Sequence, residues 1–262
     1  MKFYKALDSV KLKKYSEVDK NQFALTFYSK SGFKSSELFD KELKKKVSKF
    51  FADEKRSSLF LSKELTGLKG DFLVLRDFSK NKSEYKKYAW MKGLFVNLDK
   101  YAVENAVIYA DTSHLSKDDN FLFDLAKTAE KASYRYTDTN PNTKKELILK
   151  NVSLAVESAS AAQKRVVELG YNVGSGANTA RNLGDRPANH ATPAYIANAV
   201  KGLAKDIGGF SVEILEEKDM KKLGMGCLLS VSRGSIEPAK LVTMQYKGGK
   251  KGAKPIVLVG KG

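Results

Sequence analysis

Apolar residues in the first 157 positions fall into short runs that are separated by polar, helix-like stretches. The short runs contain many β-branched and aromatic residues, which favours strands. We predict strands at Phe23–Tyr28, Leu59–Leu61, Phe72–Leu75, Ala106–Ala110 and Leu147–Val156. Strands that alternate with helices are typical of an α/β layer, so we assign residues 1–157 to an N-terminal α/β domain.

Three segments between these strands show helical spacing of their apolar residues. The first follows a possible cap at Ser36 and extends from Leu38 to Phe50. The second carries Tyr88, Met91 and Phe95 on one face, and the third covers Asn120–Ala132. These segments are the helices of the predicted α/β layer.

The composition changes near Glu157, where small, helix-favouring residues begin. One helical face is then marked by Val166, Leu169, Val173, Ala177 and Ala180. We interpret residues 158–184 as a helix that connects two domains. A glycine costs about 1 kcal/mol relative to alanine inside a helix, so three of them predict a close approach of another backbone or a helix break. They are Gly170, Gly174 and Gly176.

Residues 185–262 are assigned to the beginning of a second domain. Pro187 should stop the connecting helix, and Thr192 before Pro193 is a typical start of the next one, which should run to about Asp206. The further predicted elements are a strand at Phe210–Leu215, a short helix at Glu217–Leu223, a turn-rich stretch at 224–238, and strands at Leu241–Tyr246 and Ile256–Val259. This alternation predicts a second α/β domain with a largely parallel sheet, in which the last strand is buried.

Composition limits the chemistry that is available. The chain has 262 residues, of which 42% are hydrophobic, and this favours two folded domains. Its single cysteine, Cys227, and its two histidines, His114 and His190, allow neither an internal disulfide nor a His/Cys metal cluster. We expect Cys227 to be a small buried residue and both histidines to be structural. No run approaches ~20 apolar residues and the N-terminus is charged, which predicts a cytoplasmic protein without a membrane span.

The formal net charge of +17 raises nucleic acid as a partner, because basic surfaces bind phosphate groups. Basic residues exceed acidic ones both in the first 157 residues and in the remainder, so the excess is spread along the chain. Local runs such as Lys247–Lys254 (KGGKKGAK) are more typical of solvated loops than of binding sites.

Gly260, Lys261 and Gly262 follow the last predicted strand, at a position where ligands gather in open α/β sheets. A phosphate-binding loop is excluded, because Pro255 takes the place of its first glycine and Gly262 the place of its Ser or Thr. A dinucleotide fingerprint at residues 174–176 fails as well, because Thr179 replaces the third glycine and no strand precedes it. The position of Lys261 alone therefore assigns no chemistry.

Four consecutive blocks in the last third resemble the leucyl aminopeptidase family of cytosolic exopeptidases, which use two metal ions. They are Asn178–Asn189 (NTARNLGDRPAN) with Thr192-Pro193, Leu223–Glu237 (LGMGCLLSVSRGSIE), Leu241–Tyr246 and Pro255–Gly262 (PIVLVGKG). The blocks occur in the family's order and with similar spacing, so the resemblance covers residues 178–262. Residues 1–157 match the family's variable N-terminal domain mainly by length and by pattern.

The resemblance implies a macro-like N-terminal α/β domain joined by the long helix to the first part of an aminopeptidase catalytic domain. It implies removal of N-terminal residues, with leucine and other apolar ones favoured, from peptide substrates. The implied cofactors are two divalent cations, Mn²⁺ or Zn²⁺, and the implied assembly is a homo-hexamer. Lys261 corresponds to one of the family's metal ligands, a role in which the lysine must be a neutral amine.

The family's other metal ligands are an aspartate five residues after this lysine and further carboxylates. None of them lies within residues 1–262. We therefore expect this polypeptide by itself to be inactive and its full-length parent to be a peptidase. Four polar residues of the first block are expected to belong to a turn that links the domains: Arg181, Asp185, Arg186 and Asn189.

Three other functions remain open. Some bacterial members of the family also act as DNA-binding architectural proteins, and the basic chain fits such a role, which would show a strong salt dependence. The N-terminal domain could bind a nucleotide, although it has no glycine-rich phosphate cradle. The protein could also be a scaffold that keeps the oligomer and lacks the catalytic ligands.

Overall fold

The computed structural model describes residues 4–18, 23–28, 41–42, 45, 49, 58–61, 72–76, 83–109, 118–139 and 147–261. By its internal contacts the chain divides into an N-terminal unit, Tyr4–Asn182, and a C-terminal unit that contains Leu183–Gly262. The helix predicted between Leu38 and Phe50 lies largely outside the described residues. In the part of the chain that is described, no helix combines the length and the apolar character needed to cross a bilayer.

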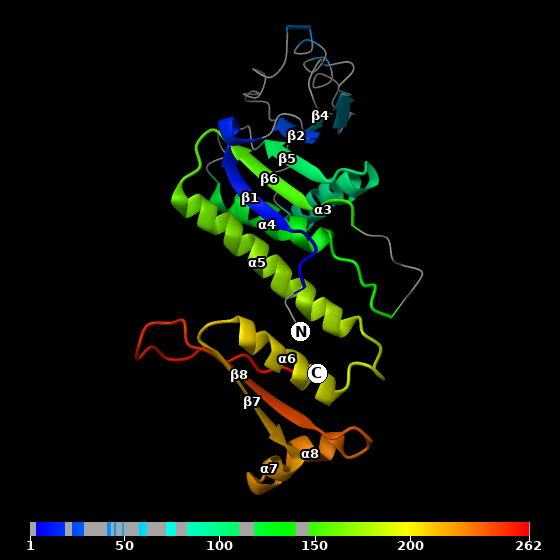
Figure 1. Ribbon diagram of the computed structural model, residues 1–262, viewed down its shortest axis with the longest axis vertical. Helices are drawn as coiled ribbons and strands as arrows, with labels where there is room; N and C mark the ends of the chain where they lie inside the picture. The colour runs from blue at the N-terminus through cyan, green and yellow to red at the C-terminus, as the bar shows by residue number, and fades with distance from the viewer. Residues whose placement is uncertain are drawn as a thin grey trace. The chain divides into compact units, whose positions relative to one another are not determined.

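The N-terminal unit is built on a six-stranded sheet in the order β1-β6-β5-β2-β4-β3 (Figure 1). Its strands are β1 (Ser9–Lys14), β2 (Phe23–Tyr28), β3 (Ser58–Leu61), β4 (Phe72–Arg76), β5 (Asn105–Tyr109) and β6 (Asn151–Val156). All neighbouring pairs are parallel except β3 and β4, which are antiparallel. The five predicted strands are therefore confirmed, although β6 begins four residues later than expected.

Strand β1 has no counterpart among the predicted strands, because lysines dilute its apolar pattern. Lys11 and Lys13 alternate with Val10 and Leu12, whose side chains are buried in the core. The strand thus has one apolar face and one charged face, as the two-residue period of a strand requires. It pairs with β6 along its whole length and is followed by a short 3-10 turn, η1 (Tyr15–Glu17).

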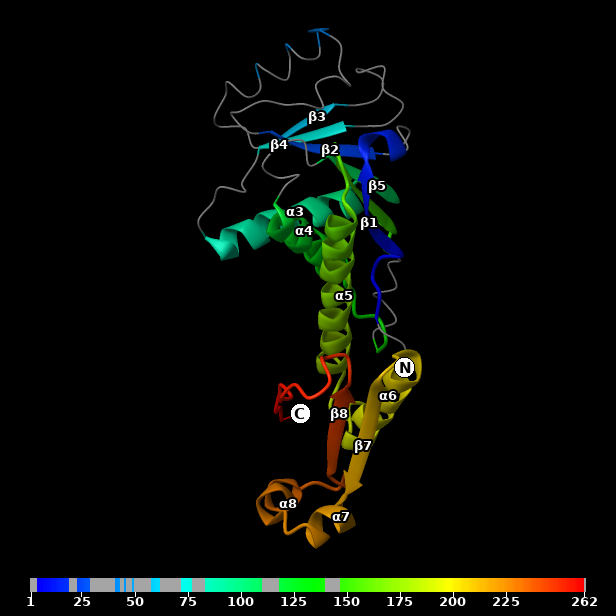
Figure 2. The ribbon, with the colours of Figure 1, turned by 90° about the vertical axis from the view of Figure 1, so that its left-hand side faces the viewer.

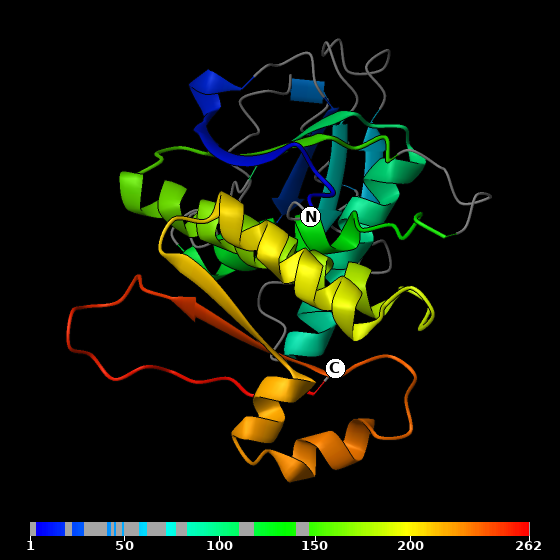
Figure 3. The ribbon, with the colours of Figure 1, turned by 60° about the horizontal axis from the view of Figure 1, so that its bottom comes forward.

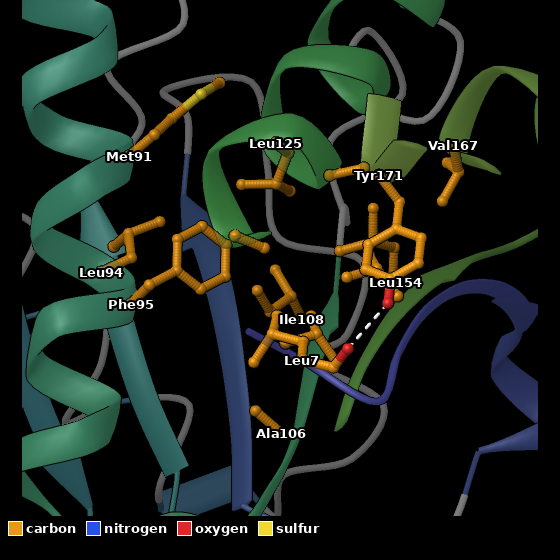
Figure 4. Close-up of a cluster of buried hydrophobic side chains, with 14 of the residues drawn as sticks. Leu7, Met91, Leu94, Phe95, Ala106, Ile108, Leu125, Leu154, Val167 and Tyr171 are labelled. Carbon is orange, nitrogen blue, oxygen red and sulfur yellow. Dashed lines mark hydrogen bonds between the residues drawn. The ribbon is translucent and has the colours of Figure 1, made fainter. Parts of the chain in front are cut away.

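Two helices, α3 (Glu84–Lys100) and α4 (Asp119–Ala132), lie side by side and confirm the predicted helices of this region. Asp118 caps α4 by accepting a hydrogen bond from the Phe121 N–H at 3.0 Å. Apolar side chains from both helices meet the sheet in one core, which includes Phe95, Ile108, Leu125 and Leu154 (Figure 4). This core positions the next helix.

Helix α5 (Ala161–Gly184) contributes Val167 and Tyr171 to the same core. Figure 2 shows α3, α4 and α5 on one side of β1 and β5. A Cβ atom at Gly170 would clash with the backbone carbonyl of Phe123 in α4, and one at Gly174 would lie 2.8 Å from the Lys127 carbonyl oxygen. Two of the three helix glycines therefore permit close backbone approach, and the helix is not broken. The third, Gly176, has open space around it.

The C-terminal unit begins with α6 (Pro193–Asp206), whose start is fixed by Thr192, which accepts a hydrogen bond from the Tyr195 N–H at 3.2 Å. The elements that follow are β7 (Phe210–Glu216), α7 (Glu217–Lys222), α8 (Gly226–Ser232) and β8 (Lys240–Tyr246) (Figure 3). Strands β7 and β8 pair antiparallel, from Phe210 opposite Tyr246 to Glu216 opposite Lys240.

Two expectations for this unit were wrong. The two described strands, β7 and β8, form an antiparallel pair. The chain leaves β7, forms α7 and α8, and enters β8 at the same end of the pair. A crossover to a parallel neighbour would have to return to the other end. The stretch 224–238 was predicted as turns, but it also contains the helix α8, which extends from Gly226 to Ser232.

Candidate functional site

The predicted metal ligand, Lys261, lies on an exposed, extended segment of the C-terminal unit (Figure 3). The segment belongs to no described strand, and the side chains of Ile256 and Leu258 are 92% and 93% exposed. The prediction of a buried strand at Ile256–Val259 is therefore wrong for this structure. Within the described residues β7 and β8 pair only with each other, so this segment joins no described sheet.

The other residues that the composition singled out do not gather around Lys261 into a donor set. His190 is exposed, and His114 lies outside the described residues. Cys227 is exposed rather than buried as predicted, because α8 has no buried residue at all. Among the residues that the structure describes, no group of three or more His, Cys, Asp or Glu side chains could hold a metal ion.

The first family-like block, Asn178–Asn189, lies at the end of α5 and in the turn after it. Asn178 is fully buried and donates a hydrogen bond to the Glu130 carbonyl oxygen of α4 at 2.8 Å. Arg181 donates to the Lys131 carbonyl oxygen at 2.9 Å, so the two side chains satisfy carbonyls of the last turn of α4. In the turn, the Arg186 guanidinium lies 4.7 Å from the ring centre of Tyr195 in α6. The block therefore ties α5 to α4 and the turn to α6.

Glu130, which belongs to none of the sequence motifs described above, has a buried carboxylate that organises a polar cluster beside this block. Glu130 has no exposed surface, and its two carboxylate oxygens accept hydrogen bonds from the backbone N–H groups of Ala6 at 2.6 Å and Leu7 at 2.9 Å. The Asn178 amide donates to the same carboxylate at 3.2 Å. Three hydrogen-bond donors thus converge on one buried carboxylate. A carboxylate that is removed from water requires such donors.

Side chains of α5 hold the same N-terminal segment from the other side. The Tyr171 hydroxyl donates to the Leu7 carbonyl oxygen at 2.7 Å (Figure 4), and the Ser175 hydroxyl donates to the Tyr4 carbonyl oxygen at 2.6 Å. The Tyr4 N–H donates to the Thr179 hydroxyl at 3.0 Å. Residues 4–7 therefore receive from side chains the backbone hydrogen bonds that a sheet would otherwise supply.

This cluster is built for anchoring rather than for catalysis. The carboxylate of Glu130 already accepts three hydrogen bonds and is closed to solvent, so it offers no position to a substrate or metal ion. Burial and the nearby Glu130 raise the pKa of Tyr171 to about 12, so its hydroxyl remains a donor at neutral pH. A sequence signal for the cluster exists: α5 carries polar residues and glycines at helical spacing on one face. They are Gly170, Tyr171, Gly174, Ser175, Asn178, Thr179 and Asn182.

The buried carboxyl should give the chain a distinctive pH dependence. Burial raises the pKa of Glu130 above its ordinary value near 4.5, although its hydrogen bonds and the charge of Lys5 act in the opposite direction. A carboxyl whose pKa is higher in the folded state stabilises the fold fully below its unfolded pKa. That contribution is lost as the pH rises through the folded pKa. We expect the unfolding free energy, relative to that of a Glu130→Gln variant, to fall as the pH rises from about 4 through the raised pKa of the folded carboxyl, and to level off above it.

Urea titrations of both proteins, followed by circular dichroism at a series of pH values, would measure this difference. The other titrating groups contribute to both proteins alike, so they cancel in the comparison. A difference that stays constant or grows with pH would show that the charge of Glu130 is compensated in the fold.

Comparison with known proteins assigns the C-terminal part of the chain. Residues 178–262 match the model of the cytosol aminopeptidase family, catalytic domain. The chain belongs to this family. A probable cytosol aminopeptidase of Aromatoleum aromaticum is 34% identical over 220 residues, which cover 80% of this chain and 43% of the relative. One of Nitrosococcus oceani is 43% identical over 141 residues, covering 53% of this chain and 28% of the relative.

Comparison with solved structures extends the similarity in fold to most of this member of the cytosol aminopeptidase family. A mutant of tomato leucine aminopeptidase matches with a TM-score of 0.71 at 19% identity, covering 92% of this chain and 52% of the tomato chain. This likeness shows that the two proteins share the α/β fold. The chain spans less than half the length of the two curated relatives described above. The match to residues 178–262 confirms the resemblance carried by the four blocks.

The described residues of this family member do not by themselves fit a metal centre. A divalent cation such as Zn²⁺ takes about three or four protein ligands, and Lys261 is the single candidate in the C-terminal segment. The described part of the chain holds no group of three or more His, Cys, Asp or Glu side chains that could complete such a site. No catalytic step through a metal ion can be derived from these residues.

Proposed function

We propose that this chain contributes to a metal-dependent aminopeptidase that removes N-terminal residues, preferentially leucine and other apolar ones, from peptides. The observation that supports the proposal is the match of residues 178–262 to the catalytic domain of the cytosol aminopeptidase family. The names of the curated relatives support the same activity and a cytoplasmic location. We further propose two divalent cations, Mn²⁺ or Zn²⁺, as cofactors and a homo-hexamer as the active assembly.

Lys261 is the residue of this chain that we propose as a metal ligand. Its neutral amine would bind one cation, and the remaining donors would have to come from outside the described residues. The bound cations would polarise the scissile carbonyl and activate water. Since a single amine cannot hold such a cation, the 262-residue chain alone should not catalyse the reaction.

An assay with leucine p-nitroanilide and added Mn²⁺ tests this expectation. The 262-residue chain should release no nitroaniline above the rate of buffer with Mn²⁺, because its described residues form no donor set that would hold the metal. Turnover that rises with chain concentration and disappears on addition of a chelator would contradict it. A fusion of this chain to the remainder of a curated relative's catalytic domain supplies the positive test.

The fusion should hydrolyse the anilide, and Lys261→Met in the fusion should reduce kcat/KM by at least about a hundredfold, as expected for loss of a group that supports the reaction at the metal. Lys254→Met is a matched control, because Lys254 is also exposed and lies seven positions earlier in the same segment. A folded fusion without activity, or one that tolerates Lys261→Met as well as Lys254→Met, would disprove the proposed role.

A further inference from the structure

Residues 4–7, here called the latch, contact α4 and α5 in the manner of an extended peptide ligand. They precede β1 and belong to no strand. Their backbone groups bond to side chains of the two helices, which are Glu130, Tyr171, Ser175 and Thr179. Lys5 is exposed and Ala6 is half-buried, so one side of the latch faces solvent. Attachment through side chains of a groove, with one side open, is typical of a bound peptide.

The two helices that form this groove are held together by contacts that do not involve the latch. Two glycines of α5 let its backbone approach the carbonyl groups of α4. Near the end of α5, Asn178 donates to the Glu130 carbonyl oxygen and Arg181 donates to the Lys131 carbonyl oxygen. Both helices also contribute apolar side chains to the core. The groove therefore keeps its walls without the latch, as a preformed binding site requires.

The Glu130 carboxylate lets the groove recognise the backbone of a peptide. Its two oxygens accept hydrogen bonds from two successive N–H groups, those of Ala6 at 2.6 Å and Leu7 at 2.9 Å. Any extended peptide with two successive N–H groups can make the same pair of bonds. A proline has no N–H group, so the groove should reject proline at either position.

Two side chains of the latch supply specificity. Leu7 has no exposed surface and packs in the core of the N-terminal unit. The ring of Tyr4 lies edge-to-face against that of Tyr134, with 5.0 Å between the ring centres. The Tyr4 hydroxyl also donates to the Arg135 carbonyl oxygen at 2.8 Å. The ligand that fits the groove is thus an extended segment in which an aromatic residue stands three positions before a leucine.

We propose that α4 and α5 form a peptide-binding site for extended segments of this kind, and that the latch is its exchangeable ligand in this chain. Ser175 and Thr179 bond to Tyr4, so occupancy of the site should order the half of α5 that leads into the family-matched residues 178–262. Linkage is reciprocal, so ordering of this half of α5 should in turn tighten peptide binding. The proposal does not depend on peptidase activity.

Thiol labelling of the intact chain measures whether the latch opens by itself. Leu7→Cys and Leu125→Cys are matched variants, because both leucines lack exposed surface and lie in the same core. With Cys227→Ser in both proteins, the thiol at position 7 should react at least about a hundredfold faster, since a local opening is easier than global unfolding. Its rate should also change little in low urea, because a local opening exposes little surface. Equal rates with equal urea dependence would overturn the proposal.

Binding in trans tests the specificity. A chain shortened to begin at Asp8 should bind the blocked, fluorescent peptide YKALDS, measured by fluorescence polarisation. Titration extends to ~1 mM, because tethering in the intact chain supplies an effective concentration of about that size. Ala6→Pro and Leu7→Asp versions of the peptide should bind at least about tenfold more weakly. Equal binding of all three peptides, or no binding, would overturn the proposal. A shortened chain that does not fold would overturn it too, because the latch would then be part of the fold.

Hydrogen exchange of the shortened chain tests the effect on α5. Saturating YKALDS should slow exchange of the amides of residues 175–182 at least about tenfold, because Ser175 and Thr179 regain their partner. The amides of α3, which bonds to no part of the latch described above, should keep their exchange rates and serve as the control. Unchanged exchange at residues 175–182 in the complex would overturn the proposed ordering of α5.

Discussion

Replacing Glu130 with alanine should destabilise the N-terminal unit by about 4 kcal/mol. The fully buried carboxylate accepts hydrogen bonds from the backbone N–H groups of Ala6 and Leu7. Its removal would leave both buried donors without an acceptor. A buried donor that loses its partner costs about 1–3 kcal/mol, so two of them cost about 2–6 kcal/mol. The loss of the desolvated charge recovers part of this cost. Chemical denaturation followed by circular dichroism would give the value.

The effect should be local as well as large. Hydrogen exchange of the Ala6 and Leu7 amides should accelerate in the variant, because their fastening to α4 is lost. Glu168→Ala is the matched control: Glu168 is an exposed glutamate on α5, and its removal should change the unfolding free energy by less than about 0.5 kcal/mol. Equal effects of the two substitutions would show that the buried hydrogen bonds of Glu130 add little to stability.

Local patterns in the sequence predict most of the secondary structure. The caps and starts of helices are local signals, and the helix that begins at Pro193 after Thr192 is observed where they place it. Short apolar runs likewise predict β2 to β6. Strand β1 was not predicted, because its alternating lysines leave too few apolar residues to form a run. The antiparallel pairing of β7 with β8 was not predicted, because strand direction depends on the connection between the strands rather than on their composition.

The faces of α5 show why burial is harder to predict than the helix itself. Its apolar residues, such as Leu169 and Val173, mark a clear face, yet this face is exposed. The buried face holds polar residues whose partners are distant in sequence: Asn178 bonds to Glu130, and Ser175 bonds to Tyr4. Burial of polar groups is favourable only when such partners are in place, and one sequence alone does not reveal them.

The candidate site divides in the same way. Four sequence blocks were sufficient to recognise the family of residues 178–262, because motifs are local and ordered along the chain. The surroundings of Lys261 were not predictable from them. A ligand set depends on donors from separate segments, and the described residues around this lysine form an exposed, extended chain. The role of Lys261 therefore remains part of the proposal, whereas the anchoring cluster at Glu130 is a feature of the structure.

Gly170→Ala should destabilise the N-terminal unit by about 2 kcal/mol, even though alanine is the better helix former. A Cβ atom at this position would clash with the carbonyl group of Phe123, which is backbone of α4 and cannot rotate away. Overpacking of this kind costs about 1–3 kcal/mol and here should lie at the upper end. Gain in helix propensity returns about 1 kcal/mol. Thermal unfolding should occur about 4–8 °C lower for a unit of this size.

The same substitution at Gly176 provides the control, because it lies six positions later in the same helix with nothing within 4 Å of an added Cβ. Gly176→Ala should therefore raise the unfolding temperature by about 2–4 °C, the effect of up to about 1 kcal/mol of helix propensity. Measurements at low protein concentration keep self-association from contributing to either value. An increase at both positions would mean that α4 moves aside without cost, and that the glycine at position 170 is not required for the packing of α5 against α4.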